Sequence, residues 1–178
     1  MVSINCHVAY NNASFNGFYG IILNNIINSE YISNYCGNNE AIGTAIGVCD
    51  LSTVYRNICE DNQIGMSIYR SRITEVVYNT FKHNSEYGLR TTGSYNRTIY
   101  NNNFIDNYYT NQSFFAQAYD DGNYTDVFGW TFWYDEISMQ GNYWSDLVWF
   151  PGANYVIDGA ISNIDLYPSE NPISIPEN

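Results

Sequence analysis

The chain has few basic residues and few charged residues of any kind. Six Lys and Arg side chains stand against eighteen Asp and Glu among 178 residues, which gives a formal net charge of −12, and charged residues make up only 13% of the chain. No stretch gathers Lys and Arg into the basic patch that nucleic-acid-binding surfaces require. The composition therefore excludes nucleic acid as a partner, and it disfavours anionic polysaccharides unless cations bridge the two surfaces.

Helical apolar spacing, long apolar runs and a basic leader are also lacking. We therefore expect no signal peptide and no membrane-spanning helix in this sequence. Asn, Tyr and Thr supply most of the polar surface, and together with the low lysine content they favour an extracellular or cell-surface location. A chain of this length is expected to form one domain with a sizeable core.

Four glycosylation sequons agree with that location. The acceptor asparagines are Asn12, Asn96, Asn111 and Asn123, each followed two residues later by Ser or Thr. Several sequons would arise by chance in a chain this rich in Asn. Their occupancy is therefore left open.

Asparagine recurs on a nearly fixed 23-residue period. One series is Asn11, Asn34, Asn57, Asn79 and Asn102, and a second is Asn16, Asn39, Asn62, Asn84 and Asn107. The single 22-residue step falls in the third repeat, where one turn is shorter by one residue. A fixed period in the twenties is typical of a solenoid, in which each repeat forms one coil stacked on the previous coil.

Apolar and glycine positions keep the same register between repeats. The main columns are Val8, Tyr31, Val54, Val76 and Ile99; Ala13, Cys36, Cys59, Phe81 and Phe104; and Gly20, Gly43, Gly65 and Gly88. Two further columns are Ile21, Thr44, Met66, Leu89 and Gln112; and Leu23, Ile46, Ile68, Thr91 and Phe114. Asn111 takes the fifth position of the glycine column. Short apolar runs between turns suit strands with one inward face. Each coil is therefore expected to contain two or three short strands.

Several segments resemble a known family. Residues 16–23 and 84–89 are similar to the repeats of NosD-like proteins, carbohydrate-binding proteins and sugar hydrolases. Residues 141–146, 155–159 and 165–168 resemble the closing segment of archaeal NosD-like cell-surface proteins. The resemblance implies an all-β fold, a right-handed parallel β-helix (solenoid) of about five 22–23-residue coils. We expect these coils over residues 1–114 and an irregular aromatic cap over residues 115–178 of the same domain.

The C-terminal segment holds all four tryptophans. They are Trp130, Trp133, Trp144 and Trp149, and Tyr143 stands beside them in the sequence. One interpretation is a cap, because an open solenoid end exposes apolar core and unpaired strand edges. The other is a platform on which sugar rings stack.

An acidic turn offers the clearest candidate for a metal. Asp120, Asp121 and Asp126 could supply oxygen ligands to Ca²⁺, which takes several of them. The alternative is an Asx-type turn that closes the last coil. The alternating Asp and Gly run that follows the Trp-Ser-Asp motif in the family is missing from this chain, which counts against bound calcium. No other cofactor is expected.

Two of the four cysteines share an inward column. Cys36 and Cys59 lie on adjacent coils, so they could form a disulfide or remain two buried thiols that act as small apolar residues. No Cys-x-x-Cys occurs, so a zinc site is not expected.

Copper sites need clusters of His, Met or Cys. Because His7 and His83 fall in different columns, copper binding is not expected either.

Two classes of function remain open. The favoured one is a non-catalytic extracellular or cell-surface module that binds carbohydrate or builds a surface assembly. The N-terminal coil has no obvious cap, and an uncapped coil invites end-to-end pairing with another chain, including a second copy. The alternative is a polysaccharide-active enzyme, a hydrolase, lyase or epimerase with carboxylates on the outer face. Asp61 with His83 on the next coil is its best acid–base pair, and a solvated surface pair is the alternative interpretation.

Overall fold

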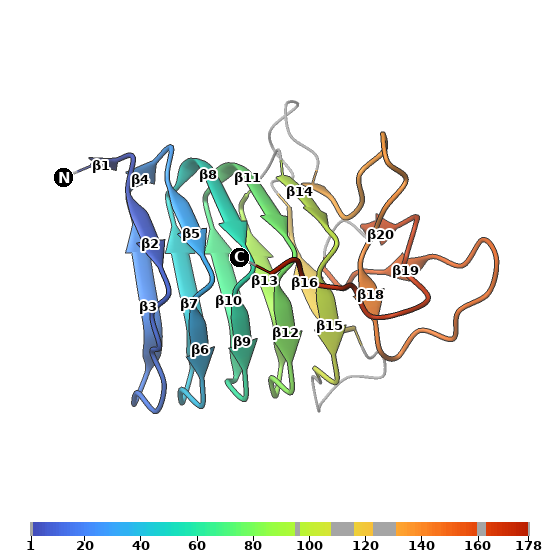
Figure 1. Cartoon of the computed structure of the whole chain (residues 1–178), viewed down its shortest axis with the longest axis horizontal. Coiled ribbons are helices and arrows are strands. Elements are labelled where there is room, and N and C mark those ends of the chain that lie inside the picture. The colour runs from blue at the N-terminus through green and yellow to red at the C-terminus, as the bar shows by residue number, and fades with distance from the viewer. Residues whose placement is uncertain (1, 95–96, 108–115, 123–130, 160–162, 178) are drawn as a thin grey trace.

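The computed structural model describes residues 2–94, 97–107, 116–122, 131–159 and 163–177. Three parallel sheets wind around one axis, and no α-helix occurs in these ranges (Figure 1). The coils stack from the N-terminal end, at the left of the view, to an irregular C-terminal part at the right. The predicted all-β, right-handed parallel β-helix is confirmed.

The strands of successive coils lie side by side in each sheet. Sheet A contains β1 (Ser3–Ile4), β2 (His7–Ala9), β4 (Ile26–Ile27), β5 (Glu30–Ile32), β8 (Asp50–Tyr55), β11 (Arg72–Val77), β14 (Arg97–Tyr100) and β17 (Thr131–Phe132). Sheet B contains β6 (Tyr35–Gly37), β9 (Ile58–Glu60), β12 (Thr80–Lys82), β15 (Asn103–Ile105) and β18 (Tyr143–Trp144). Sheet C contains β3 (Tyr19–Asn24), β7 (Ile42–Gly47), β10 (Ile64–Tyr69), β13 (Tyr87–Thr92) and β16 (Ala118–Asp120). β19 (Tyr155–Val156) and β20 (Ile164–Asp165) form an antiparallel pair.

The predicted columns are the registers of these sheets. Val8, Tyr31, Val54, Val76 and Ile99 are paired in turn across sheet A, and Cys36, Cys59, Phe81 and Phe104 across sheet B. Their side chains point inward and build the core. The glycine column has a steric cause: a Cβ on Gly65 would lie 2.5 Å from the carbonyl oxygen of Gly88.

The regular period ends earlier than the sequence predicts. Leu89 pairs with Ala118, and Phe104 pairs with Trp144, so the last steps are longer than 23 residues. The β-helix therefore has about four regular turns rather than five. Ala118 takes the slot assigned to Gln112, which lies outside the described residues. Insertions between the strands break the period, while β16, β17 and β18 of the predicted cap still continue all three sheets.

An aromatic stack closes the core at the C-terminal end. The ring centroids of Phe81 and Phe104 lie 5.1 Å apart, those of Phe104 and Trp144 4.2 Å, and those of Trp144 and Tyr155 3.9 Å. Trp133 packs beside Trp144 with its centroid 6.0 Å away. Because these rings follow one another along the helix axis, they cover the interior that an open coil would expose to water.

Candidate functional site: the two ends of the β-helix

The asparagine columns form hydrogen-bonded ladders between successive coils. Oδ1 of Asn34 accepts hydrogen bonds from N and Nδ2 of Asn11, at 3.0 and 2.8 Å. N and Nδ2 of Asn34 in turn donate to Oδ1 of Asn57, at 2.9 and 3.1 Å. The second ladder, which begins at Asn16, repeats this pattern. Each Oδ1 therefore accepts from the coil on its N-terminal side, while each internal Nδ2 donates both to the next Oδ1 and to a backbone carbonyl of the preceding coil, as Asn34 does to Val8.

At the N-terminal end the first side-chain oxygen of each ladder has no donor among the described residues. Within the described part of the chain, Oδ1 of Asn11 and Oδ1 of Asn16 accept no hydrogen bond, whereas the equivalent atoms of the next three coils each accept two. The strands β1, β2 and β3 likewise pair on one side only among the described strands. The first coil therefore ends in an unpaired edge.

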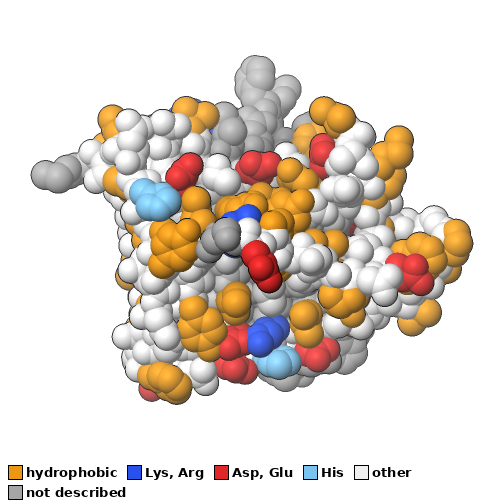
Figure 2. Space-filling view, in the orientation of Figure 1, with side chains coloured by type: hydrophobic (Ala, Val, Ile, Leu, Met, Phe, Trp, Pro, Cys, Tyr) orange, Lys and Arg blue, Asp and Glu red, His pale blue; other side chains and the backbone are white. Residues whose placement is uncertain are grey.

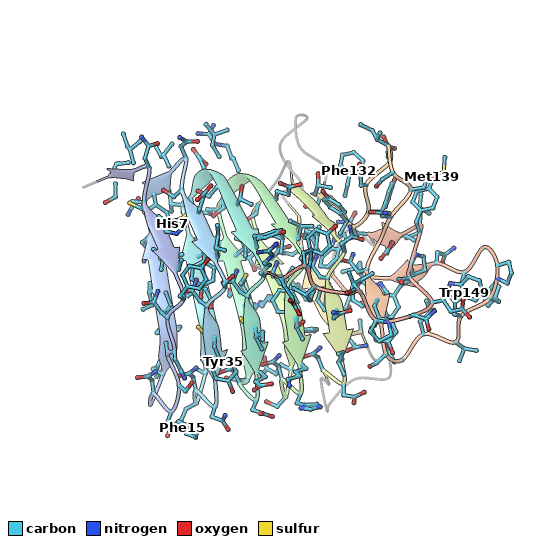
Figure 3. The ribbon with its side chains drawn as sticks, in the orientation of Figure 1. His7, Phe15, Tyr35, Phe132, Met139 and Trp149 are labelled. Atoms are coloured by element: carbon cyan, nitrogen blue, oxygen red, sulfur yellow. The ribbon has the colours of Figure 1, made fainter. Side chains whose placement is uncertain are left out.

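The same end is apolar and free of formal charge. No Asp, Glu, Lys or Arg precedes Glu30 in a chain whose net charge is −12. Large apolar side chains are exposed there, with Phe15 82%, Ile4 63% and Phe18 62% accessible. Figure 3 shows Phe15 projecting from the turn of the first coil. Cys6, Val8, Ala13 and Ile21 are the partly buried first members of the core columns.

The C-terminal end is sealed by a buried carboxylate. Asn102 donates from N and Nδ2 to Asn142, at 3.1 and 2.9 Å, and Asn142 donates to Oδ2 of Asp165, at 2.7 and 3.2 Å. Nε1 of Trp144 donates to the same oxygen at 2.9 Å. Burial raises the pKa of Asp165 to about 6, while these hydrogen bonds act in the opposite direction. Asp165 therefore accepts from the last ladder asparagine and needs no further coil.

The second ladder is also closed. N and Nδ2 of Asn107 donate to Oε1 of Gln117, at 3.1 Å each, and Nε2 of Gln117 donates to Asp146 at 2.6 Å. The hydroxyl of Tyr155 donates to the other oxygen of Asp146 at 3.1 Å. Burial and the neighbouring Asp146 carboxylate raise the pKa of this Tyr155 hydroxyl, so it keeps its proton. Backbone bonds between 118–120 and 158 cover the edge of β16.

Two carboxylates of the acidic turn that was predicted as a calcium site accept hydrogen bonds from the protein itself. Asp120 is buried, and its oxygens accept hydrogen bonds from Thr91 Oγ1, Trp133 Nε1 and Asn163 Nδ2. Asp121 accepts one from the backbone N–H of Gly93 at 2.9 Å. Asp126 lies outside the described residues. Among those that are described, no group of three or more His, Cys, Asp or Glu side chains is placed to hold a metal ion.

The aromatic residues predicted as a sugar platform do not form one surface. Trp133 and Trp144 are buried at 0% and 1% exposure, so their faces are packed in the cap rather than presented to a ligand. Tyr143 is half-buried, and Trp130 lies outside the described residues. Trp149 is 39% exposed on a loop that projects from the C-terminal end (Figure 3).

Charged side chains gather on the outer face of sheet B and its following turn. Glu60 pairs with Lys82 at 2.5 Å and accepts a hydrogen bond from the hydroxyl of Tyr35. Nδ1 of His83 lies 3.8 Å from Asp61, and both side chains are about half exposed. Acidic, basic and histidine side chains are grouped in the lower part of the face in Figure 2. The predicted Asp61–His83 pair is thus formed, as a solvated surface pair.

The paired cysteines lie in the core as free thiols. Cys36 and Cys59 occupy paired positions of β6 and β9, both at 0% exposure, and no bond joins them. Oγ1 of Thr44 lies 3.3 Å from Sγ of Cys36 and 3.7 Å from Sγ of Cys59. Burial raises the pKa of Cys59, which keeps this thiol protonated. The arrangement matches the alternative of two small buried apolar residues.

Only one predicted sequon lies in the described residues. Asn12 is exposed, and its Oδ1 accepts a hydrogen bond from the hydroxyl of Ser14, the third residue of the same sequon, at 2.6 Å. Asn96, Asn111 and Asn123 lie outside the described residues.

A known structure shares the fold. The chain is similar to the A-module of the mannuronan C-5 epimerase AlgE6 of Azotobacter vinelandii, with 17% sequence identity and a TM-score of 0.52. The match covers 65% of this chain and 38% of that module, so it shows the fold alone. No curated protein sequence matches the chain. None of the described residues forms a helix long and apolar enough to cross a membrane.

A family model described as periplasmic copper-binding protein (NosD) matches residues 1–148. The described residues do not fit a copper ion. His7 and His83 each lie beside a single carboxylate, of Glu30 and Asp61, and Cys59 keeps its proton where copper requires a thiolate. The family match and the β-helix architecture nonetheless agree along most of the sequence, and the chain belongs to the NosD family.

Proposed function

We propose that this chain is a non-catalytic module of the cell exterior that joins a larger β-helical assembly through its N-terminal coil. The observation that carries the proposal is the first coil itself. It is uncharged in an acidic chain, it exposes large apolar side chains, and its strands pair on one side only among the strands that the structure describes. Monomeric proteins rarely leave such an edge unprotected, because it pairs readily with other strands.

A further coil would complete the core at this end. Ile21 pairs with Thr44, and the same column continues through Met66 and Leu89, which are fully buried. Ile21 itself is only partly buried, since no described strand pairs with β3 on its outer side. Each stacked coil buries such a layer of apolar surface, which is favourable by about 25 cal/mol per Å². The N-terminal end therefore gains from a coil that repeats the existing register.

The cell exterior is the compartment in which we place this module. NosD is a family of periplasmic proteins, which agrees with a location outside the cytoplasm. The low content of Lys and the exposed sequon at Asn12 favour an extracellular or cell-surface protein more specifically. Protease shaving of intact source cells, with fractionation, tests the location: loss of the chain supports the surface, and full protection contradicts it.

The docking function can be tested by grafting a coil. A copy of residues 79–91 joined directly before Met1 places the copied Asn79 at the ladder spacing of 23 residues from Asn11. We expect a rise in Tm of several degrees, since stacked repeats add interface energy. A scrambled 13-residue extension is the control. Equal Tm values for the graft and the scramble would contradict a docking role for this end.

A second candidate function is binding of a neutral carbohydrate. Trp149 and Phe150 are exposed at 39% and 59% on one projecting loop, and flat aromatic faces of this kind suit sugar rings. No Lys or Arg follows Arg97, so this end would repel anionic chains. A glycan array should therefore show neutral ligands, and Trp149→Ala should abolish the signal. Val148→Ala, which changes an exposed neighbour on the same loop, is the matched control.

The rival enzymatic function has one observation in its favour, the formed Asp61–His83 pair. The similar A-module belongs to a protein named mannuronan C-5 epimerase, which makes uronans the first substrates to assay. Reducing-sugar, unsaturated-product and epimerisation assays should show no turnover. Activity that disappears in both Asp61→Asn and His83→Gln, but not in Asp50→Asn, would establish the enzyme instead.

A further inference from the structure

Residues 171–177, which we call the strap, lie as an extended segment against the outside of the β-helix. In Figure 1 this dark red segment runs from the C-terminal part back across the front of the view, past the end of β11. Ile173 and Ile175 are half-buried, whereas the residues between and beside them are exposed. This alternation is typical of a strand with one face against a surface. The strap therefore turns two aliphatic side chains, two residues apart, toward the β-helix.

The side chain of Asn103 binds the backbone of the strap. Asn103 is the first residue of β15 and points outward, since its neighbour Phe104 belongs to the core. Its Oδ1 accepts a hydrogen bond from the backbone N–H of Ile173 at 2.7 Å, and its Nδ2 donates to the carbonyl oxygen of Ile173 at 3.0 Å. One side-chain amide thus pairs with both backbone groups of one residue, as a neighbouring strand would. Pairing of this kind recognises an extended peptide.

The outside of the β-helix is covered at the corner where sheet A turns into sheet B. Asn103 is 5% exposed and Val77 is 4% exposed, although each stands next to a core residue in its strand and so points away from the core. Ile58, which occupies the position of Asn103 two coils earlier, is 39% exposed. We call the surface formed by Val77, Tyr78, Tyr100 and Asn103 the corner face. It offers one amide together with apolar and aromatic groups.

Few contacts hold the strap in place. Among the described residues, the hydrogen bonds between 172–177 and the rest of the chain all come from Asn103. The chain before the strap is fixed, because the backbone N–H of Ser169 donates to the carbonyl oxygen of Asn142 at 2.9 Å. Residues 170–172 between these two points are exposed. We therefore expect the strap to open locally about residues 170–172 while the coils stay folded.

We propose that the corner face is a binding site for an extended peptide segment of a partner protein, and that the strap is its resident ligand. The partner segment carries aliphatic side chains two residues apart with an uncharged residue between them, because that is the pattern seated there now. The strap competes at an effective concentration of the order of millimolar, as a tethered ligand does. The site therefore opens only to a segment that displaces the strap. It lies on the side of the β-helix, so this inference is independent of the coil docking proposed above.

The site is tested in trans with the chain's own segment. Ile173→Asp with Ile175→Asp in the full-length chain places charges against the corner face and should release the strap. A fluorescein-labelled peptide of residues 170–177 should then bind saturably, by fluorescence anisotropy, about tenfold or more tightly than to the natural chain. The matched control is Ser174→Asp with Pro176→Asp, which puts the same charges at exposed positions and should bind as the natural chain does. Equal affinity of the released and natural chains, or no saturable binding to the released chain, would overturn the proposal.

The role of Asn103 is tested by a double-mutant cycle in the released chain. Asn103→Ala should weaken peptide binding by about tenfold or more, and Ile105→Ala, at the next outward position of β15, should change it little. A peptide methylated on the backbone nitrogen of Ile173 lacks the donor to Oδ1 and should also bind the released chain more weakly. The Asn103→Ala chain should discriminate little between the two peptides, because the same hydrogen bond is already absent. Fully additive losses would mean that the peptide binds elsewhere or in another orientation.

The opening of the strap has its own readout in the natural chain, which does not depend on how any variant folds. Hydrogen exchange followed by NMR should show the amide of Ile173 exchanging about a hundredfold or more faster than the amides of β15, because the strap opens without unfolding the coils. The unlabelled peptide of residues 170–177 at millimolar concentration should accelerate this exchange further, since it competes for the corner face. Protection of Ile173 equal to that of β15 would mean that the strap leaves only on global unfolding, and it would overturn the site.

Discussion

At the scale of residues, the most informative side chain is the carboxylate that ends the first ladder. Asp165 is fully buried and accepts hydrogen bonds from Asn142 and Trp144. An asparagine at its place would present one oxygen and one amide group, as every other ladder position does. The chain uses a carboxylate at this position instead, which provides acceptors only. This side chain therefore marks the end of the repeat chemically as well as sterically.

The raised pKa of Asp165 predicts a pH effect on stability. The folded-state pKa of about 6 exceeds the ordinary value of 3.8, so the folded state binds this proton more tightly than the unfolded state. The resulting stabilisation is present below about pH 4 and is lost as the pH rises through 6, by roughly 3 kcal/mol. Chemical denaturation at pH 4.5 and 7.5 should show Asp165→Asn gaining stability relative to the natural chain as the pH rises. A difference that does not change with pH would contradict the assignment.

The ladders predict that position, rather than residue type, decides the cost of losing an asparagine. Asn79 is fully buried, and Asn79→Ala would remove the oxygen that accepts from N and Nδ2 of Asn57. It would also remove the Nδ2 group that donates to Oδ1 of Asn102 and to the carbonyls of Val54 and Val77. At about 1–3 kcal/mol for each unsatisfied buried group, we expect a loss of at least 3 kcal/mol in unfolding free energy. Asn11→Ala at the open end should cost less than about 1 kcal/mol. Urea denaturation of both variants checks the contrast, and equal losses would contradict it.

At the scale of strands, close stacking of turns requires glycine in one column. A Cβ on Gly65 would lie 2.5 Å from the backbone oxygen of Gly88, and backbone in the middle of a sheet cannot move aside alone. Gly65→Ala should therefore lower the unfolding free energy by about 2 kcal/mol or more. Gly17→Ala is the control, because a Cβ there meets nothing within 4 Å. Comparable thermal denaturation of the two variants would show that the column is not sterically constrained.

The strand registers show which columns and ladders can be predicted from the sequence. Period and polarity predicted the inward columns and both ladders correctly as far as Asn102 and Asn107, because each repeat copies the previous one. Asn142 was missed, since insertions place it 40 residues after its partner Asn102. A local signal was present: an asparagine two residues before an inward Cys, Phe or Trp recurs at Asn34, Asn57, Asn79, Asn102 and Asn142. Spacing alone cannot follow a column through insertions, but this short pattern can.

The candidate site was predicted less well than the fold, for a physical reason. Composition identifies Trp133 and Trp144 as aromatic but does not say which side of a coil they face, and both are buried in the cap. The same holds for Asp120, which looks like a metal ligand in sequence and accepts hydrogen bonds from buried donors in the structure. The expected lack of a cap on the first coil stays a prediction, and among the described strands β1, β2 and β3 pair on one side only.

At the scale of the whole molecule, the two ends of the β-helix differ in charge, hydrogen bonding and packing. All twenty-four charged residues follow Ser29, so the N-terminal end is neutral while the rest of the chain is strongly acidic. The C-terminal end closes both ladders on buried acceptors and covers the core with stacked rings. Among the described strands, those of the first coil pair on one side only, whereas residue 158 and Ser169 cover the edges of β16 and β18. We therefore propose that a further coil stacks on the N-terminal side.

Hydrogen exchange of β3, with and without the grafted copy of residues 79–91, is the sharpest test of an N-terminal end that docks a coil. In the natural chain, amides of β3 should exchange much faster than those of β10, which lies between two neighbouring strands. In the grafted chain, we expect β3 to slow by more than about tenfold, as for an edge strand that becomes internal, while β16 is unchanged. Protection of β3 equal to that of β10 before grafting, or no slowing afterwards, would contradict an open end that docks a coil.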